Sequence, residues 1–254
     1  MTAVEKLLEN VSQAKLRAVA RAISILEDDL PGAIELASAI EAMRPRGVVI
    51  GITGAAGVGK SSLANKLVEC IKARVQRVGV LAIDPSSPRT QGAFLGDRIR
   101  MIQHATDSRV LMRSMATRGM VGGVARAARA ATQVMALAGC DPILLETTGV
   151  GQVETAIKQY ADIVTVVLCP GAGDEVQTLK AGLFEIADLI VVNKSDKPGA
   201  DELLAWLRSS LEGTRTALFA ASASRGDGVW ELAADLAARE SQARGAGPLR
   251  IERT

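Results

Sequence analysis

A glycine-rich segment followed by a lysine and two serines has the composition of a phosphate-binding loop. The segment matches G-x-x-x-x-G-K-[ST] and lies between an apolar run and a helix-like stretch. Glycines let successive backbone N–H groups turn toward an anion, and the positive end of the following helix adds attraction. Lys60 is expected to reach the β- and γ-phosphates as a catalytic residue, Ser61 to ligate magnesium, and Ser62 to contact the α-phosphate. The predicted phosphate-binding residues are Gly54, Ala55, Ala56, Gly57, Val58, Gly59, Lys60, Ser61 and Ser62.

Two later segments are candidates for recognising the base of a nucleotide. The first ends an apolar run with an N-K-x-D pattern that resembles the base-specificity motif of GTPases. The Asp196 carboxylate would accept hydrogen bonds from guanine N1 and N2, which adenine cannot supply, while Lys194 would lie along the base and Asn193 would hold the loop. Taken alone, the pattern could also be polar residues that end a strand, and the second segment a small-residue strand end. That second segment resembles the S-A-x element of GTPases and consists of Ser222, Ala223 and Ser224.

Acidic residues end two of the apolar runs and could hold a magnesium ion. Asp84 ends the run V-G-V-L-A-I-D, and Glu146 ends I-L-L-E. Magnesium prefers an octahedral shell of oxygen ligands and keeps several waters. One of these carboxylates is therefore expected to bind it beside Ser61, directly or through water.

The segments that follow these two carboxylates could respond to the nucleotide. Gly149 comes shortly after Glu146, and its amide is placed to contact a γ-phosphate. The segment after Asp84 contains Asp97, Arg98 and Arg100. A charged loop downstream of a magnesium ligand has the character of a switch that the triphosphate orders. The same three residues could instead form an exposed helix face.

Composition excludes several classes of protein. The 254 residues carry 30 Lys plus Arg against 28 Asp plus Glu, which argues against a protein that grips nucleic acid by charge. The apolar runs are too short to span a bilayer, and the N-terminus does not resemble a secretory signal, so no membrane association is expected. The three cysteines suit reduced thiols and a cytoplasmic location. With one histidine, neither a histidine metal site nor a Ser-His-Asp triad is expected.

The spacing of apolar residues predicts an α/β fold with a mostly parallel central sheet flanked by helices. Residues 2–43 read as helical, with a break at 28–32 and a second helix at 33–43. We expect an N-terminal helical extension at 1–45, a nucleotide-binding domain at 46–238, and a polar tail at 239–254 whose composition suits disorder. Strands are predicted at 48–53, 78–84, 109–113, 142–146, 163–169, 189–193 and 217–221. Helices are predicted to begin near Lys60, Gly92, Val121, Val153, Thr178, Asp201 and Val229.

Together these motifs resemble the MeaB/MMAA family, also called ArgK-type, of the SIMIBI class of P-loop GTPases. The resemblance runs from about residue 16 to about residue 238. The loop at residues 90–93 lacks the Gly-Gly form typical of the family, and the stretch between Asp196 and the S-A-x element is shorter. The motifs that carry the resemblance are GAAGVGKSS, LAIDPSS, LGDRIRM, ETTGVGQVE and NKSD.

The resemblance implies more than the motifs do alone. Family members bind GTP or GDP with Mg²⁺ and are chaperones of adenosylcobalamin-dependent acyl-CoA mutases such as methylmalonyl-CoA mutase. They gate cofactor loading and protect the mutase. They usually carry a further C-terminal helical arm that contributes to dimerisation, so the resemblance makes a homodimer a further expectation. By this similarity Asp84, Asp97 and Glu146 match the acidic residues around the magnesium and the catalytic site. Gln152 lies in the segment that matches the third-motif loop and is a further catalytic candidate.

Slow hydrolysis that a partner accelerates is expected, because Val150 stands where Ras-like enzymes carry a water-orienting Gln. Asp97, Arg98 and Gln152 are the residues that a partner could bring into place. Two alternatives remain open at this point. One is a P-loop kinase or ATPase of the same fold that acts on a small molecule, and the other is a nucleotide-switched scaffold with negligible turnover.

Overall fold

The computed structural model describes residues 2–84, 107–116, 121–147, 157–171 and 183–245. For residues 84, 116, 121–126 and 183 it describes the backbone alone. The chain divides into two compact units, one of residues 1–49 with 74–145 and the other of residues 50–73 with 146–254. We describe each unit by itself.

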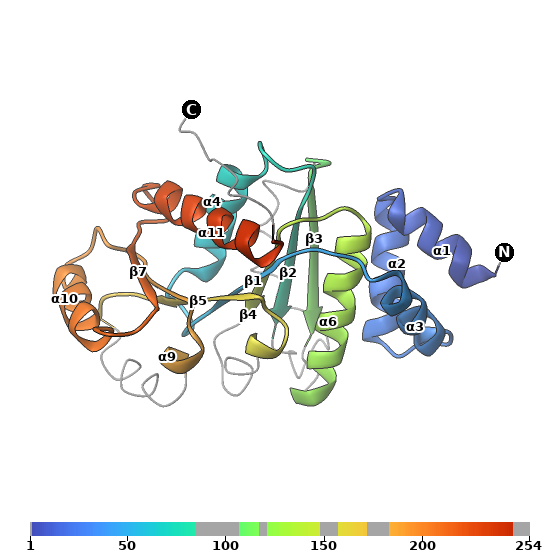
Figure 1. The fold of residues 1–254 in the computed structure, drawn as a ribbon, viewed down its shortest axis with the longest axis horizontal. Helices are drawn as coiled ribbons and strands as arrows, with labels where there is room; N and C mark the ends of the chain where they lie inside the picture. The colour runs from blue at the N-terminus through green and yellow to red at the C-terminus, as the bar shows by residue number, and fades with distance from the viewer. Residues whose placement is uncertain (1, 85–106, 117–120, 148–156, 172–182, 246–254) are drawn as a thin grey trace. The chain divides into compact units, whose positions relative to one another are not determined.

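The first unit combines parallel strands with a covering helix. Strands β2 (Val78–Asp84) and β3 (Val110–Ala116) pair in parallel, and the strand order is β3-β2-β4, with β4 at Ile143–Thr147. Helix α6 (Val121–Leu137) packs on β2 and β3. Its other neighbours are the N-terminal helices α1 (Ala3–Ser12), α2 (Leu16–Glu27) and α3 (Ala33–Met43), which Figure 1 shows beyond α6.

The N-terminal segment forms three helices where the sequence predicted two. The difference lies at residues 13–15, where Ala14 has a φ of +54° and the Lys15 ammonium donates to the Asn10 side chain at 2.6 Å. In one continuous helix, the apolar residues of the two halves would lie along the same side and could not pack against each other. The turn instead lets the buried faces of α1 and α2 meet, with Val11 and Val19 fully buried.

The second unit holds the other strands in the order β1-β5-β6-β7, with parallel pairing throughout. The first three of these strands are buried along their length, while β7 is half-exposed at the edge. Helix α11 packs on α4, and α10 packs on β6 and β7 (Figure 1). The elements are β1 (Val49–Thr53), α4 (Lys60–Ile71), η2 (Ile157–Gln159), β5 (Ile163–Leu168), α9 (Leu183–Ile186), β6 (Leu189–Val192), α10 (Ala200–Ser210), β7 (Ala217–Ala220) and α11 (Val229–Ala243).

All seven predicted strands are present, and the fold class is confirmed. Strand β3 extends three residues further than predicted, to Ala116, because it pairs with β2 over its whole length. Helix α11 continues to Ala243, beyond the predicted domain end at 238, with Glu240 buried and paired with Arg244. The helix starts predicted at Lys60, Val121 and Val229 are observed, and α10 begins one residue before Asp201. Those predicted near residues 92, 153 and 178 lie outside the described residues.

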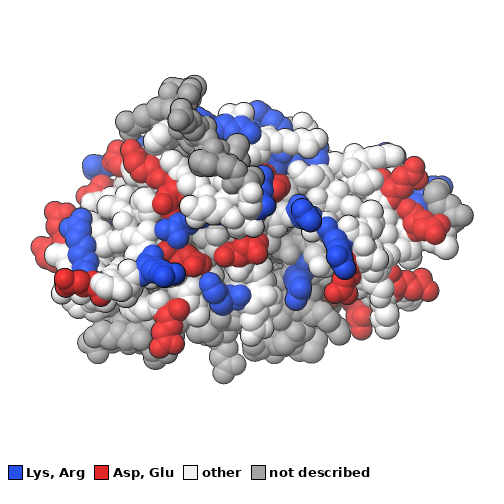
Figure 2. All heavy atoms as spheres, viewed as in Figure 1, with Lys and Arg blue, Asp and Glu red and all other residues white. Residues whose placement is uncertain are grey.

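Charge is distributed as the near-balanced composition suggests. On the face shown in Figure 2, basic and acidic side chains are interspersed. Among the helices that the structure describes, none is both long and apolar enough to cross a bilayer.

Candidate functional site

The loop between β1 and α4 has the backbone of an anion-binding turn. Gly54, Gly57 and Gly59 have φ values of +138°, +79° and +94°, which L-residues with a side chain rarely adopt. Two of them are also closely approached. A Cβ on Gly54 would collide with the Val167 carbonyl oxygen, and one on Gly59 would collide with the Asn193 amide nitrogen. The glycines at both positions are therefore required by neighbouring strands as well as by the turn.

Lys60 begins α4 and points back across this loop. Its ammonium donates to the carbonyl oxygens of Gly54 at 2.7 Å and Ala55 at 2.8 Å, and the residue is only 6% exposed. Val58 is buried beneath the loop, whereas Ala56, Gly57 and Ser62 are exposed. A buried cation beside a helix N-terminus creates a positive site that suits phosphate groups.

Ser61 and Glu146 supply adjacent oxygen atoms at this site. The Ser61 hydroxyl donates to Glu146 Oε1 at 2.6 Å, and both residues are less than 10% exposed. A hydroxyl and a carboxylate are oxygen ligands of the kind that magnesium prefers, so the residues present fit the ion. Asp84 ends β2, where only its backbone is described, and Asp97, Gly149 and Gln152 lie outside the described residues.

The predicted base-recognition segment is attached directly to the phosphate loop. The Asn193 side-chain amide donates to the Val58 carbonyl at 2.8 Å, and its oxygen accepts from the Ala223 N–H at 3.0 Å. The Lys194 ammonium donates to the Gly57 carbonyl at 2.7 Å. Asn193 thus joins three segments of the chain by hydrogen bonds.

Asp196 lies next to the S-A-x-like segment. The Ser222 hydroxyl donates to Asp196 Oδ1 at 2.7 Å, and Ser222 Oγ is 3.2 Å from Ser224 Oγ. This hydrogen bond, with smaller contributions from Arg225 and Lys197, holds the pKa of Asp196 below its usual value. The carboxylate is therefore ionised at neutral pH and acts only as an acceptor, which suits a ligand edge with two N–H donors.

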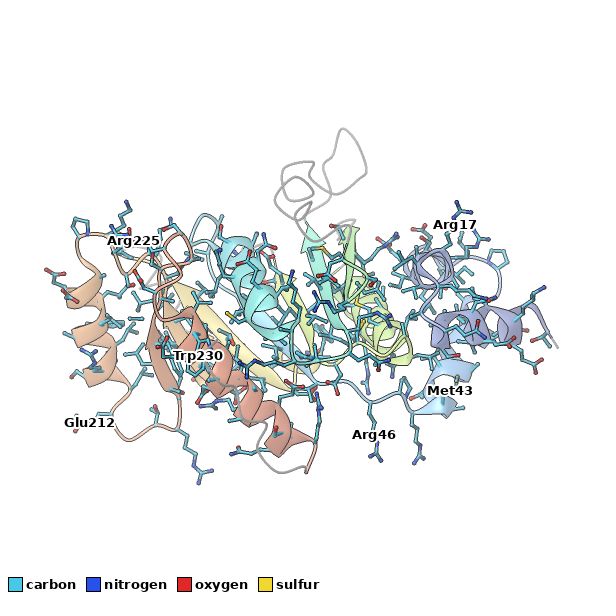
Figure 3. All side chains as sticks on the ribbon, turned by 90° about the horizontal axis from the view of Figure 1, so that it is seen from above. Arg17, Met43, Arg46, Glu212, Arg225 and Trp230 are labelled. Carbon is cyan, nitrogen blue, oxygen red and sulfur yellow. The ribbon has the colours of Figure 1, made fainter. Side chains whose placement is uncertain are left out.

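Sequence reasoning missed three residues of this site. Thr147 Oγ1 donates to Thr53 Oγ1 at 2.9 Å, and both threonines are buried. Arg225, labelled in Figure 3 on the loop before α11, lies 3.7 Å from Asp196. The signal for the threonines was their position, since Thr53 directly precedes Gly54 and Thr147 directly follows Glu146. Arg225 has only its place after Ser224 to mark it.

Comparison with known proteins identifies relatives. A profile of the family described as methylmalonyl-CoA mutase-associated GTPase MeaB matches residues 19–254. A protein of Pyrococcus abyssi described as a GTPase is 48% identical over 209 residues, which are 82% of this chain and 64% of that protein. A fused isobutyryl-CoA mutase of Geobacillus kaustophilus is 35% identical over 212 residues, covering 80% of this chain and 19% of that protein.

Solved structures agree on the fold. A LAO/AO transport system kinase superposes with a TM-score of 0.71 at 22% identity, covering 96% of this chain and 81% of that one. A hydrogenase maturation factor HypB from Archaeoglobus fulgidus superposes with a TM-score of 0.57 at 22% identity, covering 80% of this chain and 96% of that one. The chain spans just under two thirds of the length of the Pyrococcus relatives it matches. From the match over residues 19–254, the chain belongs to the family of methylmalonyl-CoA mutase-associated GTPases, MeaB.

Proposed function

We propose that this chain binds and hydrolyses GTP, and that its nucleotide state controls an adenosylcobalamin-dependent acyl-CoA mutase. The observation that carries the GTP part is the attachment of the base-recognition segment to the phosphate loop. Asn193 and Lys194 contact the carbonyls of Val58 and Gly57, so one ligand with a base and a phosphate chain can meet both segments. Ser222 orients the Asp196 carboxylate at the end where guanine would bind.

Hydrolysis transfers the γ-phosphoryl group of GTP to water and releases GDP. Lys60 and the N–H groups of the loop would stabilise the charge on the phosphate oxygens. Mg²⁺, held by Ser61 and Glu146 and by Asp84 or Asp97, would supply further charge neutralisation. We assign Gln152 and Asp97 to the completion of the catalytic arrangement, and Gly149 to sensing of the γ-phosphate. The intrinsic rate is expected to be slow.

The proposed action on a mutase is supported by the family and by one relative in particular. The family is described as methylmalonyl-CoA mutase-associated, and the Geobacillus relative is itself a fused isobutyryl-CoA mutase. We propose that the chain gates cofactor loading and protects the mutase. A cytoplasmic location stays a prediction, based on three scattered cysteines that suit reduced thiols. A homodimer likewise stays a prediction.

The first experiment tests base recognition. The unsubstituted protein should bind GTP far more tightly than ATP, and Asp196→Asn should weaken GTP by roughly 2–3 kcal/mol while favouring xanthosine triphosphate, because the carboxylate acceptor becomes an amide. Calorimetric titration with the three nucleotides measures this. Asp201→Asn, the same change at an exposed position of α10, should leave GTP affinity unchanged. Equal affinity of the unsubstituted protein for GTP and ATP would refute guanine specificity and favour a kinase or ATPase.

The second experiment tests the partner. GTP turnover should rise when a cobalamin-dependent acyl-CoA mutase is added, and the mutase should bind the GTP and GDP forms with different affinities, because a partner that shifts the nucleotide state must itself respond to it. Phosphate release and binding titrations measure both quantities, with Asp97→Ala and Gln152→Ala as comparisons. The chaperone role is wrong if no mutase of the source cell changes GTP turnover and each of them binds the GTP and GDP forms with equal affinity. The GTPase role would still stand.

A further inference from the structure

Two cations lie beside the oxygen of Asp196 that Ser222 does not contact. Arg225 Nε and Lys197 Nζ are each 3.7 Å from Asp196 Oδ2. The carboxylate side chain is only 6% exposed, whereas the two cationic side chains are 64% and 63% exposed. At 3.7 Å neither cation is within ordinary hydrogen-bond distance of the carboxylate. Both therefore attract it without taking the hydrogen-bonding positions that an N–H donor of a ligand would use.

Arg225 differs from Lys197 in how its backbone is held. The Arg225 N–H donates to the Ser222 carbonyl at 3.1 Å, and the Ser222 N–H donates to the Asp227 carbonyl at 2.9 Å. The tight turn that places the Ser222 hydroxyl on Asp196 Oδ1 thus also places the guanidinium near Oδ2. Lys197 belongs instead to the turn of Asp196 itself, in which its N–H donates to the Lys194 carbonyl at 2.9 Å.

We propose that Arg225 is a positioning residue for guanine recognition, which holds the Asp196 carboxylate from the side opposite to Ser222 so that both oxygens face the donors of the base. This inference rests on the proposed GTP binding and extends it. Ser222 fixes one oxygen by a hydrogen bond, and Arg225 restrains the other by charge. The arrangement gives a residue outside the N-K-x-D pattern a share in nucleotide specificity.

The effect should be modest and should depend on salt. Exposed ion pairs contribute about 0.2–1 kcal/mol, so Arg225→Ala should weaken GDP binding by a factor of about 1.4 to 5 at low salt, with a smaller loss near 1 M salt. Arg225→Lys should retain most of the affinity, because it keeps the charge. Inosine diphosphate lacks the 2-amino group and forms one hydrogen bond fewer with Asp196, so its affinity should change less than that of GDP.

The decisive measurement repeats the Arg225→Ala substitution in a protein that has an uncharged asparagine at position 196. In an Asp196→Asn background, titrated with GDP at millimolar concentration, Arg225→Ala should cause no further loss, since the residue acts through the carboxylate. Arg215→Ala removes another exposed arginine of the same unit and is the matched control, with no expected effect.

Four outcomes can be distinguished. If the unsubstituted protein does not bind guanine nucleotides, the proposed function itself fails. If it binds them and Arg225→Ala behaves like Arg215→Ala, the proposed role of Arg225 is wrong. The role is also wrong if Arg225→Ala weakens GDP equally with aspartate and with asparagine at position 196. A salt-dependent loss confined to the aspartate background establishes it.

Discussion

The hydrogen bond between Thr53 and Thr147 joins the residue before the phosphate loop to the residue after Glu146. Both hydroxyls are buried, so each depends on the other for a partner more than a surface group would. A contact of this kind aligns the ends of two strands, one of which leads into the proposed phosphate loop. Its contribution is therefore to the geometry of the site as well as to stability.

Thr147→Val should lower the free energy of unfolding by about 1–3 kcal/mol, because it leaves the Thr53 hydroxyl buried without its donor. Thr53→Val should cost a similar amount. The double variant should be destabilised by less than the sum of the two, since no hydroxyl is then left without a partner. Urea unfolding of the four proteins without nucleotide measures this, and strictly additive losses would contradict the proposed dependence.

At the scale of elements, the loop between β1 and α4 depends on contacts as well as on its own backbone. Gly57 and Gly59 both have positive φ, but only at Gly59 would an added Cβ meet another segment, at the Asn193 side chain. Around Gly57 there is open space for a Cβ. The two glycines can therefore be compared directly. A side chain at either position would have to adopt a left-handed backbone conformation, but only a side chain at position 59 would also collide with Asn193.

Gly57→Ala should destabilise the protein by about 1–2 kcal/mol, the cost of placing a side chain in the left-handed region. Gly59→Ala should cost clearly more, because its Cβ must also displace Asn193. Since Asn193 holds the loop to Ala223, Gly59→Ala should in addition reduce the preference for GDP over ADP. Chemical denaturation and a titration with each nucleotide give the two readouts. Equal stability losses and equal preferences in the two variants would show that the Asn193 contact has no such role.

At the scale of the whole molecule, the described residues assigned to the phosphate loop and to base recognition all belong to the second unit. A ligand that binds only the folded protein stabilises it by an amount that rises with the logarithm of the ligand concentration relative to its dissociation constant. The increase in the free energy of unfolding when nucleotide is added therefore reports on binding at the proposed site.

GDP at about 100 times its dissociation constant should raise the free energy of unfolding by roughly 2.7 kcal/mol. Amide hydrogen exchange should slow most at residues 54–62, 193–196 and 222–225. Lys60→Ala should lose most of this stabilisation at the same GDP concentration, because its ammonium would no longer meet the phosphates. If GDP stabilised the Lys60→Ala variant as much as the unsubstituted protein, Lys60 would not be the residue that meets the phosphates.

The parts of this protein that the sequence alone determined are those whose physical causes are local. Glycines at the positions of positive φ, a lysine at the first turn of α4, and apolar runs long enough for buried strands are each visible within a few residues. Those signals located all seven strands and most of the described helix starts. The break between α1 and α2 escaped them, because helical periodicity continues through residues 13–15 and only packing of the two apolar faces favours a turn.

Tertiary structure decided how the motifs join. Asn193 meets Val58 across 135 positions of the chain, and Thr147 meets Thr53 across 94. Hydrogen bonds over such separations depend on which strand ends lie side by side, and no spacing along the chain encodes that. The same holds for Arg225, whose charge lies beside Asp196 because the turn after Ser222 returns to it. Side-chain type could suggest the chemistry of these residues, but only folding brings their atoms within reach of one another.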